Sequence, residues 1–579
     1  MKKRLDRREF LRSGTAIGSL AVAGAALAQE GDKRPPLSSA QQLTIAERIA
    51  DLNYTDAERA QVFENLDAMV TRVRARRTGA PLVNSDIPAQ TFDPRLPGKT
   101  YKAQENKVRL SGNKAGPLPP DRDIAFAPIW KQGAWIRRGY ISSSRLTDLY
   151  LQRIKTYAPK LDCYITVMED SARQEAFQAD VDLQNGKDRG PLHGIPYGLK
   201  DLADTAGVRT SWGAMPYKDR VPAKDAEIVT RLRAAGAVLL GKTSLGALAY
   251  DDLWFAGHTK NPWDIEEGSS GSSAGSASAT AAGLCGFSIG SETLGSIVSP
   301  SARCGTVGLR PTFGRIPRTG VMALCWSLDK LGPICRYTED TALVLSALNG
   351  SDNKDPCAFD WGFAYDGIAA ASDSIKIGYD PAWFQDATVS DGLVLSRLQE
   401  MGFKLVEVKL PDLPYNTLFT TVEVEAAAAF EELTLTNRDD LLRWQDAEAW
   451  PNTFRAAHFI SAVEALQVDR FRRQVMEMMA GIYEEVDLLV SPNFTELLTI
   501  TNYTGTPSLT LPVSMENRQS TPLIGAKKMD VNRKSFPHPH AITLWGNMFR
   551  EDQLIAVGRL LEESFRFNTN RPDLSSLPQ

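Results

Sequence analysis

Apolar and polar positions alternate along most of the chain, and the period of the alternation changes many times. Apolar residues at every third or fourth position predict helices, and short continuous apolar runs predict buried strands. The predicted helices cover residues 144–156, 171–184, 226–235, 421–435, 460–485 and 552–567. The predicted strands cover residues 164–168, 196–199, 237–240, 375–378, 404–406, 488–490, 508–513 and 541–545. This order favours an α/β layered domain around one sheet.

The pattern before residue 125 is different. Residues 43–76 carry an approximate helical stripe of apolar residues, and Thr55, followed by Asp56 and Glu58, is typical of a helix start. Residues 81–120 are polar and rich in proline and glycine, which predicts an irregular segment wrapped on the main domain. We therefore expect a leader at 1–28, a partly helical N-terminal extension at 29–124 and a main domain at 125–570.

The first 28 residues have the features of an export signal. Arg7 and Arg8 form a twin-arginine pattern, a weakly apolar run covers 13–27, and Ala26-Leu27-Ala28 matches a cleavage site before Gln29. No segment approaches the ~20 apolar residues that a membrane span requires. We expect the twin-arginine export machinery to carry the folded protein to the periplasm or beyond, with no membrane attachment of the mature form. A non-cleaved N-terminal anchor is the alternative.

Composition excludes several classes of function. Of the 579 residues 43% are apolar and 23% charged, as in ordinary globular proteins. The net charge of −4 gives no indication of a nucleic-acid partner. The six cysteines form no C-x-x-C pair and, with only five histidines, predict neither a disulfide framework nor a zinc site. We expect neither a metal nor a cofactor.

The stretch 268–305 is rich in serine and glycine. This composition is typical of a flexible linker. The stretch also contains a small-residue helical segment at 274–284, a buried strand at 285–289 and a tight turn at 290–296. Serines stand at both ends of the helix, with glycine where the backbone approaches closely. We therefore interpret 268–305 as a packed site.

Residues 236–243 match the phosphate-loop pattern G-x-x-x-x-G-K-[ST]. In a phosphate loop, the residues between the glycines form a polar turn after a strand. Here residues 237–240 are Ala-Val-Leu-Leu, which themselves predict a strand, and a helix precedes them. The match therefore indicates a structural strand and not a nucleotide site.

A nucleophilic serine needs a base, and the histidines do not provide one. None of them accompanies a G-x-S-x-G turn. A lysine can serve instead if burial lowers its pKa from about 10.4 toward neutrality. Lys200 ends the apolar run 194–199 and is expected at the end of a buried strand, where its ammonium form would be desolvated.

Several segments in fixed order resemble the amidase signature family of serine hydrolases. They cover residues 191–201, 261–264, 270–279, 290–297, 487–492 and 502–512, and the resemblance extends over roughly 125–570. It implies a central mixed β-sheet with helices on both faces. It also implies a Ser–cisSer–Lys triad.

Carried over by position, the triad falls on Lys200 as base, Ser272 as bridging serine after a cis peptide bond, and Ser296 as nucleophile. Neutral Lys200 would take a proton from Ser272, and Ser272 would take one from Ser296 as its hydroxyl attacks a carbonyl carbon. The oxyanion hole would be formed by the backbone N–H groups of Thr293, Leu294, Gly295 and Ser296.

The neighbourhood of the triad departs from the family pattern at several positions. Ser273, beside the bridging serine, is expected to help hold its loop. Leu294 and Ala274 stand where glycine is usual. Val298 replaces a common arginine, and Glu292 replaces an aspartate. The three triad positions are intact.

The resemblance implies an amidase that hydrolyses a carboxamide, or a related carbamate or ester, through an acyl-enzyme. A glutaminase-type subunit of a tRNA-dependent amidotransferase is one alternative, and the export signal argues against it because that partner is cytoplasmic. A catalytically silent binding protein on the same scaffold is another. Aromatic residues within 211–217, 250–255 and 444–458 predict a pocket for an apolar acyl or aryl group.

Overall fold

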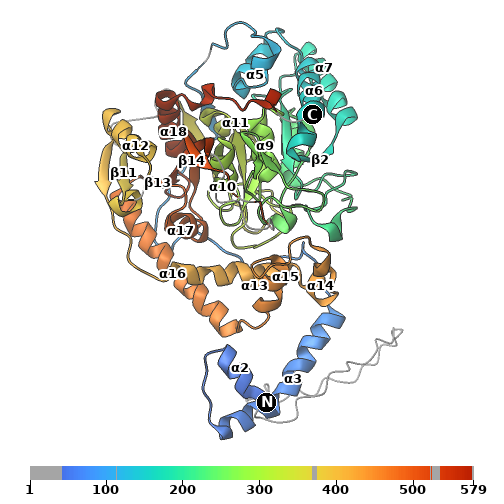
Figure 1. Cartoon of the computed structure of the whole chain (residues 1–579), viewed down its shortest axis with the longest axis vertical. Coiled ribbons are helices and arrows are strands. Elements are labelled where there is room, and N and C mark those ends of the chain that lie inside the picture. Colours follow the sequence, from blue (N-terminus) through green and yellow to red (C-terminus); the bar gives the residue numbers. More distant parts are fainter. Residues whose placement is uncertain are drawn as a thin grey trace, which may run out of the picture. The chain divides into compact units, whose positions relative to one another are not determined.

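A computed structural model describes residues 42–112, 114–367, 375–385, 387–521, 523–524 and 535–576 (Figure 1). The twin-arginine pattern and its cleavage site lie outside these residues, so the export signal stays a prediction. The chain divides into two compact units, one ending at Ala80 and the other starting at Pro81. Residues 81–124, predicted as part of the N-terminal extension, group with the second unit.

The described part of the first unit, from residue 42 on, contains α2 (Leu43–Ile49) and α3 (Asp56–Gly79). The start of α3 is fixed by a capping box, as the sequence predicted. The Thr55 hydroxyl accepts a hydrogen bond from the backbone N–H of Glu58 at 3.3 Å, and the Glu58 carboxylate accepts one from the N–H of Thr55 at 2.7 Å. The apolar stripe of 43–76 is therefore divided between two helices.

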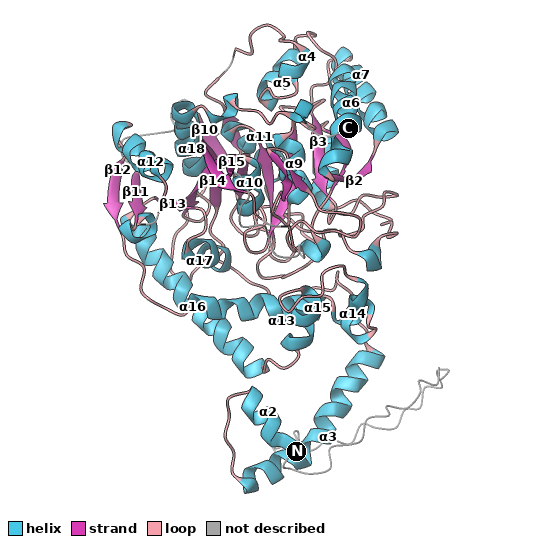
Figure 2. Cartoon of the chain, in the orientation of Figure 1, coloured by secondary structure: helices cyan, strands magenta, loops and turns pink. Residues whose placement is uncertain are grey.

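The second unit is built around an 11-stranded mixed sheet with the order β12-β11-β13-β15-β14-β8-β9-β7-β3-β4-β2. Figure 2 shows these strands as a central layer with helices packed around it. β3 runs parallel to β4 and β7, whereas β7 and β9 are antiparallel. The bounds are β2 Tyr164–Val167, β3 Pro196–Lys200, β4 Val238–Thr243, β7 Phe287–Glu292, β8 Val307–Arg310, β9 Lys330–Cys335, β11 Lys376–Tyr379, β12 Lys404–Glu407, β13 Leu488–Pro492, β14 Ser508–Gln519 and β15 Ser535–Gly546.

Helices pack directly on this sheet: α7 on β4, α9 on β7, α11 on β9 and α18 on β14. The longer helices are α5 Ile129–Arg137, α6 Ser143–Leu161, α7 Glu169–Gln184, α8 Glu227–Ala234, α9 Ala274–Ala281, α11 Thr338–Leu348, α12 Val389–Glu400, α13 Phe419–Ala429, α15 Trp450–Ala457, α16 Ala462–Glu485, α17 Glu496–Thr504 and α18 Glu551–Phe565. Shorter ones are α4 Asp121–Ile124, α10 Val298–Cys304 and α14 Glu431–Leu435. The pairs β1 (Lys107–Arg109) with β10 (Ala364–Asp366) and β5 (Lys260–Asn261) with β6 (Asp264–Gly268) form two small sheets. The predicted α/β fold is confirmed.

The sheet and one helix packed on it differ from the sequence prediction. The strands β8 and β9, which are central in the sheet, and the helix α11 were not predicted. The tight turn predicted at 290–296 begins later, because Gly290, Ser291 and Glu292 continue β7 and pair with β9. The turn is therefore confined to residues 293–296.

The phosphate-loop match lies in β4, as predicted. The Lys242 ammonium group is fully buried and donates to the Ala203 carbonyl at 2.7 Å and the Thr210 hydroxyl at 2.8 Å. Its nitrogen also lies 3.4 Å from a carboxylate oxygen of Asp201. A lysine enclosed in this way cannot reach a phosphate group, so it has a structural role.

All six cysteines are buried and free, so no disulfide bond contributes to the fold. Among the helices that the structure describes, none combines the length and the apolar character that crossing a bilayer requires.

Candidate active site

Lys200 lies at the end of β3, between β4 and β7 in the sheet, and its side chain is only 1% exposed. Its Nζ atom is 2.8 Å from the Ser272 hydroxyl, 3.0 Å from the Ser273 hydroxyl and 2.9 Å from the Ser291 hydroxyl. A strand end in the sheet thus brings a single amine into a cluster of three serines from two other segments.

The environment of Lys200 favours its neutral form. Burial lowers the pKa of Lys200 well below its usual value, because an ammonium ion without water is costly. The nearby carboxylates of Asp329 and Glu292 act in the opposite direction and raise this pKa, but less strongly than burial lowers it. The cluster therefore favours the neutral amine, which is the form that can accept a proton.

The loop before α9 presents Ser272 to Lys200. The Gly271–Ser272 peptide bond is cis, as the family resemblance implied. The backbone carbonyl of Asp251 lies where a side chain at Gly271 would begin, so only glycine fits there. Gly275 in α9 is packed as tightly against the backbone at Ser244. The small residues of this segment are therefore needed for its close packing.

Ser273 connects the segments of the cluster. Its hydroxyl donates to the Ser291 carbonyl at 3.0 Å and accepts from the Ser291 backbone N–H at 3.1 Å. Its own backbone N–H donates to the Ser296 carbonyl at 3.1 Å. Ser273 thus links β7 and the turn after it to the loop that carries Ser272.

Residues 293–296 form the turn between β7 and α10. Gly295 has φ +88°, a conformation that favours glycine. The Thr293 hydroxyl donates to the Asp329 carboxylate at 2.6 Å and fixes the start of the turn. Ser296 is nearly buried, and among the residues that the structure describes no hydrogen bond joins its hydroxyl to Ser272. The backbone therefore brings Ser296 to the cluster without closing this last contact.

Glu292 holds the far side of the same turn. One carboxylate oxygen accepts the backbone N–H groups of Ile297 at 2.8 Å and Val298 at 3.0 Å. The other accepts from Arg310 at 2.7 Å and from Asn502 at 2.8 Å. Burial would raise the pKa of Glu292, but the Arg310 guanidinium and the Val298 N–H lower it to about 2. A permanently ionised carboxylate thus fixes the chain directly after Ser296.

A cavity of about 440 Å³ lies beside the cluster, and its wall includes Ser291, Thr293 and Asp329. Much of the remaining wall comes from residues 318–326 and 83–87. Its volume is that of a small-molecule site.

The aromatic segments predicted to form the pocket are placed differently. Only Trp212 from these segments lines the large cavity. Five others surround a separate, smaller recess: Tyr250, Trp254, Phe255, Trp444 and Trp450. Aromatic content alone therefore did not identify the walls of the cavity.

Comparison with known proteins settles the family. The profile of the family described as Amidase matches residues 145–555. The chain belongs to the amidase family. One similar protein is AmiD of Mycobacterium bovis, a putative amidase by its name, 33% identical over 474 residues that cover 79% of this chain and 98% of AmiD. Another belongs to the glutamyl-tRNA(Gln) amidotransferase of Carboxydothermus hydrogenoformans, and this subunit is 30% identical over 485 residues that cover 76% of this chain and 97% of the relative. The native peptide amidase of Stenotrophomonas maltophilia has a similar structure, with a TM-score of 0.66, 28% identity and coverage of 78% and 99%.

The departures from the amidase family pattern have a structural explanation at Glu292 and Val298. Val298 is buried and offers only its backbone N–H to Glu292. The guanidinium that neutralises Glu292 comes instead from Arg310 on β8. Leu294 packs against the hydrophobic core and Ala274 begins α9, fully buried. Arg310 therefore neutralises Glu292 in this chain, and position 298 contributes only a backbone N–H group.

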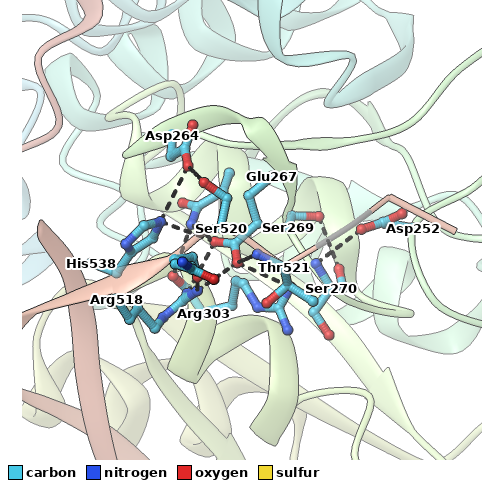
Figure 3. A network of polar contacts seen from close by, with 12 residues as sticks. Asp252, Asp264, Glu267, Ser269, Ser270, Arg303, Arg518, Ser520, Thr521 and His538 are labelled. Carbon is cyan, nitrogen blue, oxygen red and sulfur yellow. Dashed lines mark hydrogen bonds and ion pairs between the residues drawn. The ribbon is translucent and has the colours of Figure 1, made fainter. Parts of the chain in front are cut away.

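A buried network of charges anchors the segment that leads to the bridging serine (Figure 3). Glu267 of β6 is 2.7 Å from Arg518 and 3.6 Å from Arg303 of α10. His538 of β15 lies 3.3 Å from Asp264 and 3.5 Å from Glu267. Burial would raise the pKa of Glu267, but Arg518 and Arg303 lower it to about 2. The network ties β14, β15 and α10 to β6.

The residues between this network and the cis peptide bond are held as well. The Asp252 carboxylate accepts the backbone N–H of Ser270 at 3.1 Å (Figure 3). The Ser270 hydroxyl pairs with that of Ser299 in α10 at 2.6 Å. Hydrogen bonds thus fix the chain up to Gly271, directly before the bridging serine.

Two polar residues of the site were missed by the sequence analysis. Ser291 contacts Lys200, and Asp329 holds Thr293. Burial raises the pKa of Asp329, whereas its hydrogen bonds with Thr293 and with the Cys325 N–H lower it. Ser291 lies within the segment 290–297 that carries the family resemblance, but its contact with Lys200 depends on the pairing of β3 and β7.

Proposed function

We propose that the chain hydrolyses a carboxamide, or a related carbamate or ester, through an acyl-enzyme on Ser296. One observation carries the proposal: a buried lysine, whose pKa is lowered by burial, lies 2.8 Å from the Ser272 hydroxyl beside the cavity. Membership of the amidase family supports the same chemistry.

The hydrogen bonds around Lys200 define the direction of proton transfer. The Ser273 proton is directed to the Ser291 carbonyl, so Ser273 can only accept from Lys200. We infer that the neutral amine donates to Ser273 and Ser291 and keeps its lone pair for the proton of the Ser272 hydroxyl, 2.8 Å away. Lys200 then accepts the Ser272 proton, and Ser272 accepts the Ser296 proton as Ser296 Oγ bonds to the carbonyl carbon. The proton then passes back through Ser272 to the leaving amine as its bond to the carbonyl carbon breaks, which leaves the acyl-enzyme. Water then attacks the acyl-enzyme, and the returning proton releases Ser296 and the acid.

The turn 293–296 supplies the electrostatic part of the mechanism. The attacked carbonyl oxygen gains negative charge, which backbone N–H groups of Thr293, Leu294, Gly295 and Ser296 would stabilise. Thr293, held by Asp329, and the Glu292 carboxylate fix this turn at its two ends. Such donors contribute because they are oriented before the reaction begins.

The glutaminase-type alternative has the same serine chemistry, so the location of the protein separates the two. The relative from Carboxydothermus hydrogenoformans is part of an amidotransferase. We place this chain outside the cytoplasm because of the twin-arginine pattern at Arg7 and Arg8.

An alkyl fluorophosphonate tests the proposed chemistry without knowledge of the natural substrate. Ser296 Oγ should bond to phosphorus as fluoride leaves, and peptide mass spectrometry should locate one adduct on Ser296. Ser296→Ala should give no adduct and keep the wild-type melting temperature, since a single hydroxyl is removed. An adduct on another residue, or a folded wild-type protein that never reacts, would rule out the proposed nucleophile.

Changing Arg7-Arg8 to Lys-Lys should retain the precursor inside the cell, because the twin-arginine machinery reads this pair. Fractionation of cells expressing either form, followed by immunoblotting, measures the effect. The wild-type chain should appear outside the cytoplasm, starting at Gln29. Equal export of both forms would show that the leader had been misinterpreted.

A further inference from the structure

A short turn at residues 83–87 lies outside the part of the chain matched by the family profile, yet it forms part of the cavity wall. The profile begins at residue 145, whereas Val83, Asn84, Ser85 and Ile87 border the same cavity as Ser291 and Thr293. A segment that precedes the family match thus lines the same cavity as Ser291 and Thr293, which lie beside Lys200 and Ser296.

The turn has a defined local structure. The Val83 carbonyl accepts the backbone N–H of Asp86 at 2.9 Å, and the Asp86 carboxylate accepts the N–H of Val83 at 2.8 Å. These two bonds close the turn on itself. The side chains of Val83 and Ile87 remain 64% and 46% exposed. Their apolar surface is therefore not buried in the core and is free to contact a bound group.

Asn84 fastens the turn to the opposite wall. Its side-chain amide donates to the Ala323 carbonyl at 2.7 Å and accepts the Ala323 N–H at 2.9 Å. The side-chain amide thus pairs with the backbone of Ala323 through two hydrogen bonds, as adjacent strands pair in a sheet, although 239 residues separate the two partners. It also reaches the Ala429 carbonyl at 3.4 Å. The turn is therefore a fixed wall.

Hydrogen bonds connect this wall to the turn 293–296. Leu324 and Cys325, which follow Ala323, donate their N–H groups to Asp329 at 2.8 Å and 3.0 Å. The same carboxylate accepts the Thr293 hydroxyl. The turn at 83–87 is thus linked to the proposed oxyanion hole by a short series of hydrogen bonds.

The cavity between these elements suits an apolar group. Val321, Met322, Leu324 and Trp326 contribute apolar surface to its wall. Its arginines are neutralised: Arg220 pairs with Asp204 at 2.7 Å and Arg318 with Asp355 at 2.9 Å. These cations are therefore occupied within the protein.

We propose that the turn 83–87 is a specificity-determining wall, which contacts the far end of an extended apolar acyl or aryl group bound beside Ser296. This rests on the proposed function, because the cavity is taken as the substrate site. We expect a short acyl group to stay near Ser291 and Thr293, away from Val83 and Ile87, so the turn should select for length and leave the chemistry of small substrates unchanged.

Methyl and octyl fluorophosphonates measure this selection as rates of Ser296 labelling. The octyl probe should react faster with the wild-type protein. Val83→Glu should slow the octyl probe about tenfold, because a carboxylate replaces apolar contact surface, and should change the methyl probe less than twofold. Asn84→Ala, which releases the wall, should also reduce the preference for octyl. Val463→Glu is the matched control: this valine of α16 is 70% exposed and does not line the cavity, so both rates should be unchanged.

The possible results separate the two proposals. If Ser296 of the folded wild-type protein reacts with neither probe, the proposed function fails and this inference fails with it. If Ser296 reacts but both variants keep the wild-type octyl-to-methyl ratio, the proposed function stands and the wall is refuted. Equal slowing of both probes would likewise refute it, since the turn would then act on Thr293 and not on substrate length. Melting temperatures of the variants show that each rate comes from folded protein.

Discussion

Lys200→Ala should lower kcat/KM by about 10² to 10⁴-fold, the usual contribution of a positioned general base. The amine is the group that the serine cluster surrounds, with three hydroxyl oxygens within 3.0 Å of Nζ. Without it, the Ser272 proton has no acceptor, and neither serine can become a better nucleophile. Initial rates with any substrate or ester analogue that the wild-type protein hydrolyses measure the effect.

The pH profile distinguishes loss of the base from general damage. Lys200 acts in its neutral form, which predominates above its pKa, so wild-type kcat/KM should rise with pH. Because burial lowers the pKa of Lys200 well below its ordinary value, the rise should be centred below the ~10.4 of a free lysine. Lys200→Ala should remove this limb. A limb near ~6.5 that survives the substitution would indicate a histidine base and contradict the mechanism.

Lys242 provides a matched control on the next strand. It is as buried as Lys200, and burial also lowers its pKa, but it binds Ala203, Thr210 and Asp201. Lys242→Met should destabilise the protein and leave the rising limb in the activity of the folded molecules. If both Lys200→Ala and Lys242→Met remove the rise of kcat/KM with pH, that rise depends on the folding of the sheet and not on the Lys200 amine.

Glu292→Ala should cost about 3 to 5 kcal/mol of unfolding free energy, because it leaves the fully buried Arg310 without its partner. It should also lower kcat strongly in the molecules that remain folded. The Ile297 and Val298 N–H groups lose the carboxylate that holds the chain after Ser296. Urea unfolding gives the first quantity, and active-site titration with a fluorophosphonate corrects the second for folded protein.

Glu551→Ala separates stability from positioning. Glu551 is also fully buried, pairs with Arg315 at 2.9 Å and accepts the Thr312 N–H at 2.8 Å. Its loss should cost a similar unfolding free energy and leave kcat of the folded protein unchanged. If Glu292→Ala behaves in the same way, Glu292 is a structural residue and does not position Ser296.

The fold could be predicted where one period dominates a long stretch. The helices α6, α7 and α16 and the strands β3 and β13 lie where the pattern placed them. β8 and β9 escaped prediction because glycine or proline interrupts both, as Gly308 and Pro333 do, and such residues usually weaken a strand. Their neighbours in the sheet decide their structure, and a local pattern does not contain those neighbours.

The candidate site could be predicted only as far as its residues lie in recognisable motifs. Lys200, Ser272 and Ser296 were predicted in this way, and the structure brings the first two into contact. Asp329 and Asn84 carry no motif. Asn84 meets Ala323 across 239 residues of sequence, so its contact depends on the completed fold.

The six free, buried cysteines have a consequence for where this protein can mature. No covalent bond of the folded chain depends on oxidation, so its final chemical structure is the same in a reducing and in an oxidising compartment. The chain can therefore finish folding in the cytoplasm, before the proposed export, and would meet no later requirement for a disulfide isomerase. Burial also raises the pKa of thiols such as Cys163 and Cys335, which favours their protonated, slowly reacting form in either compartment.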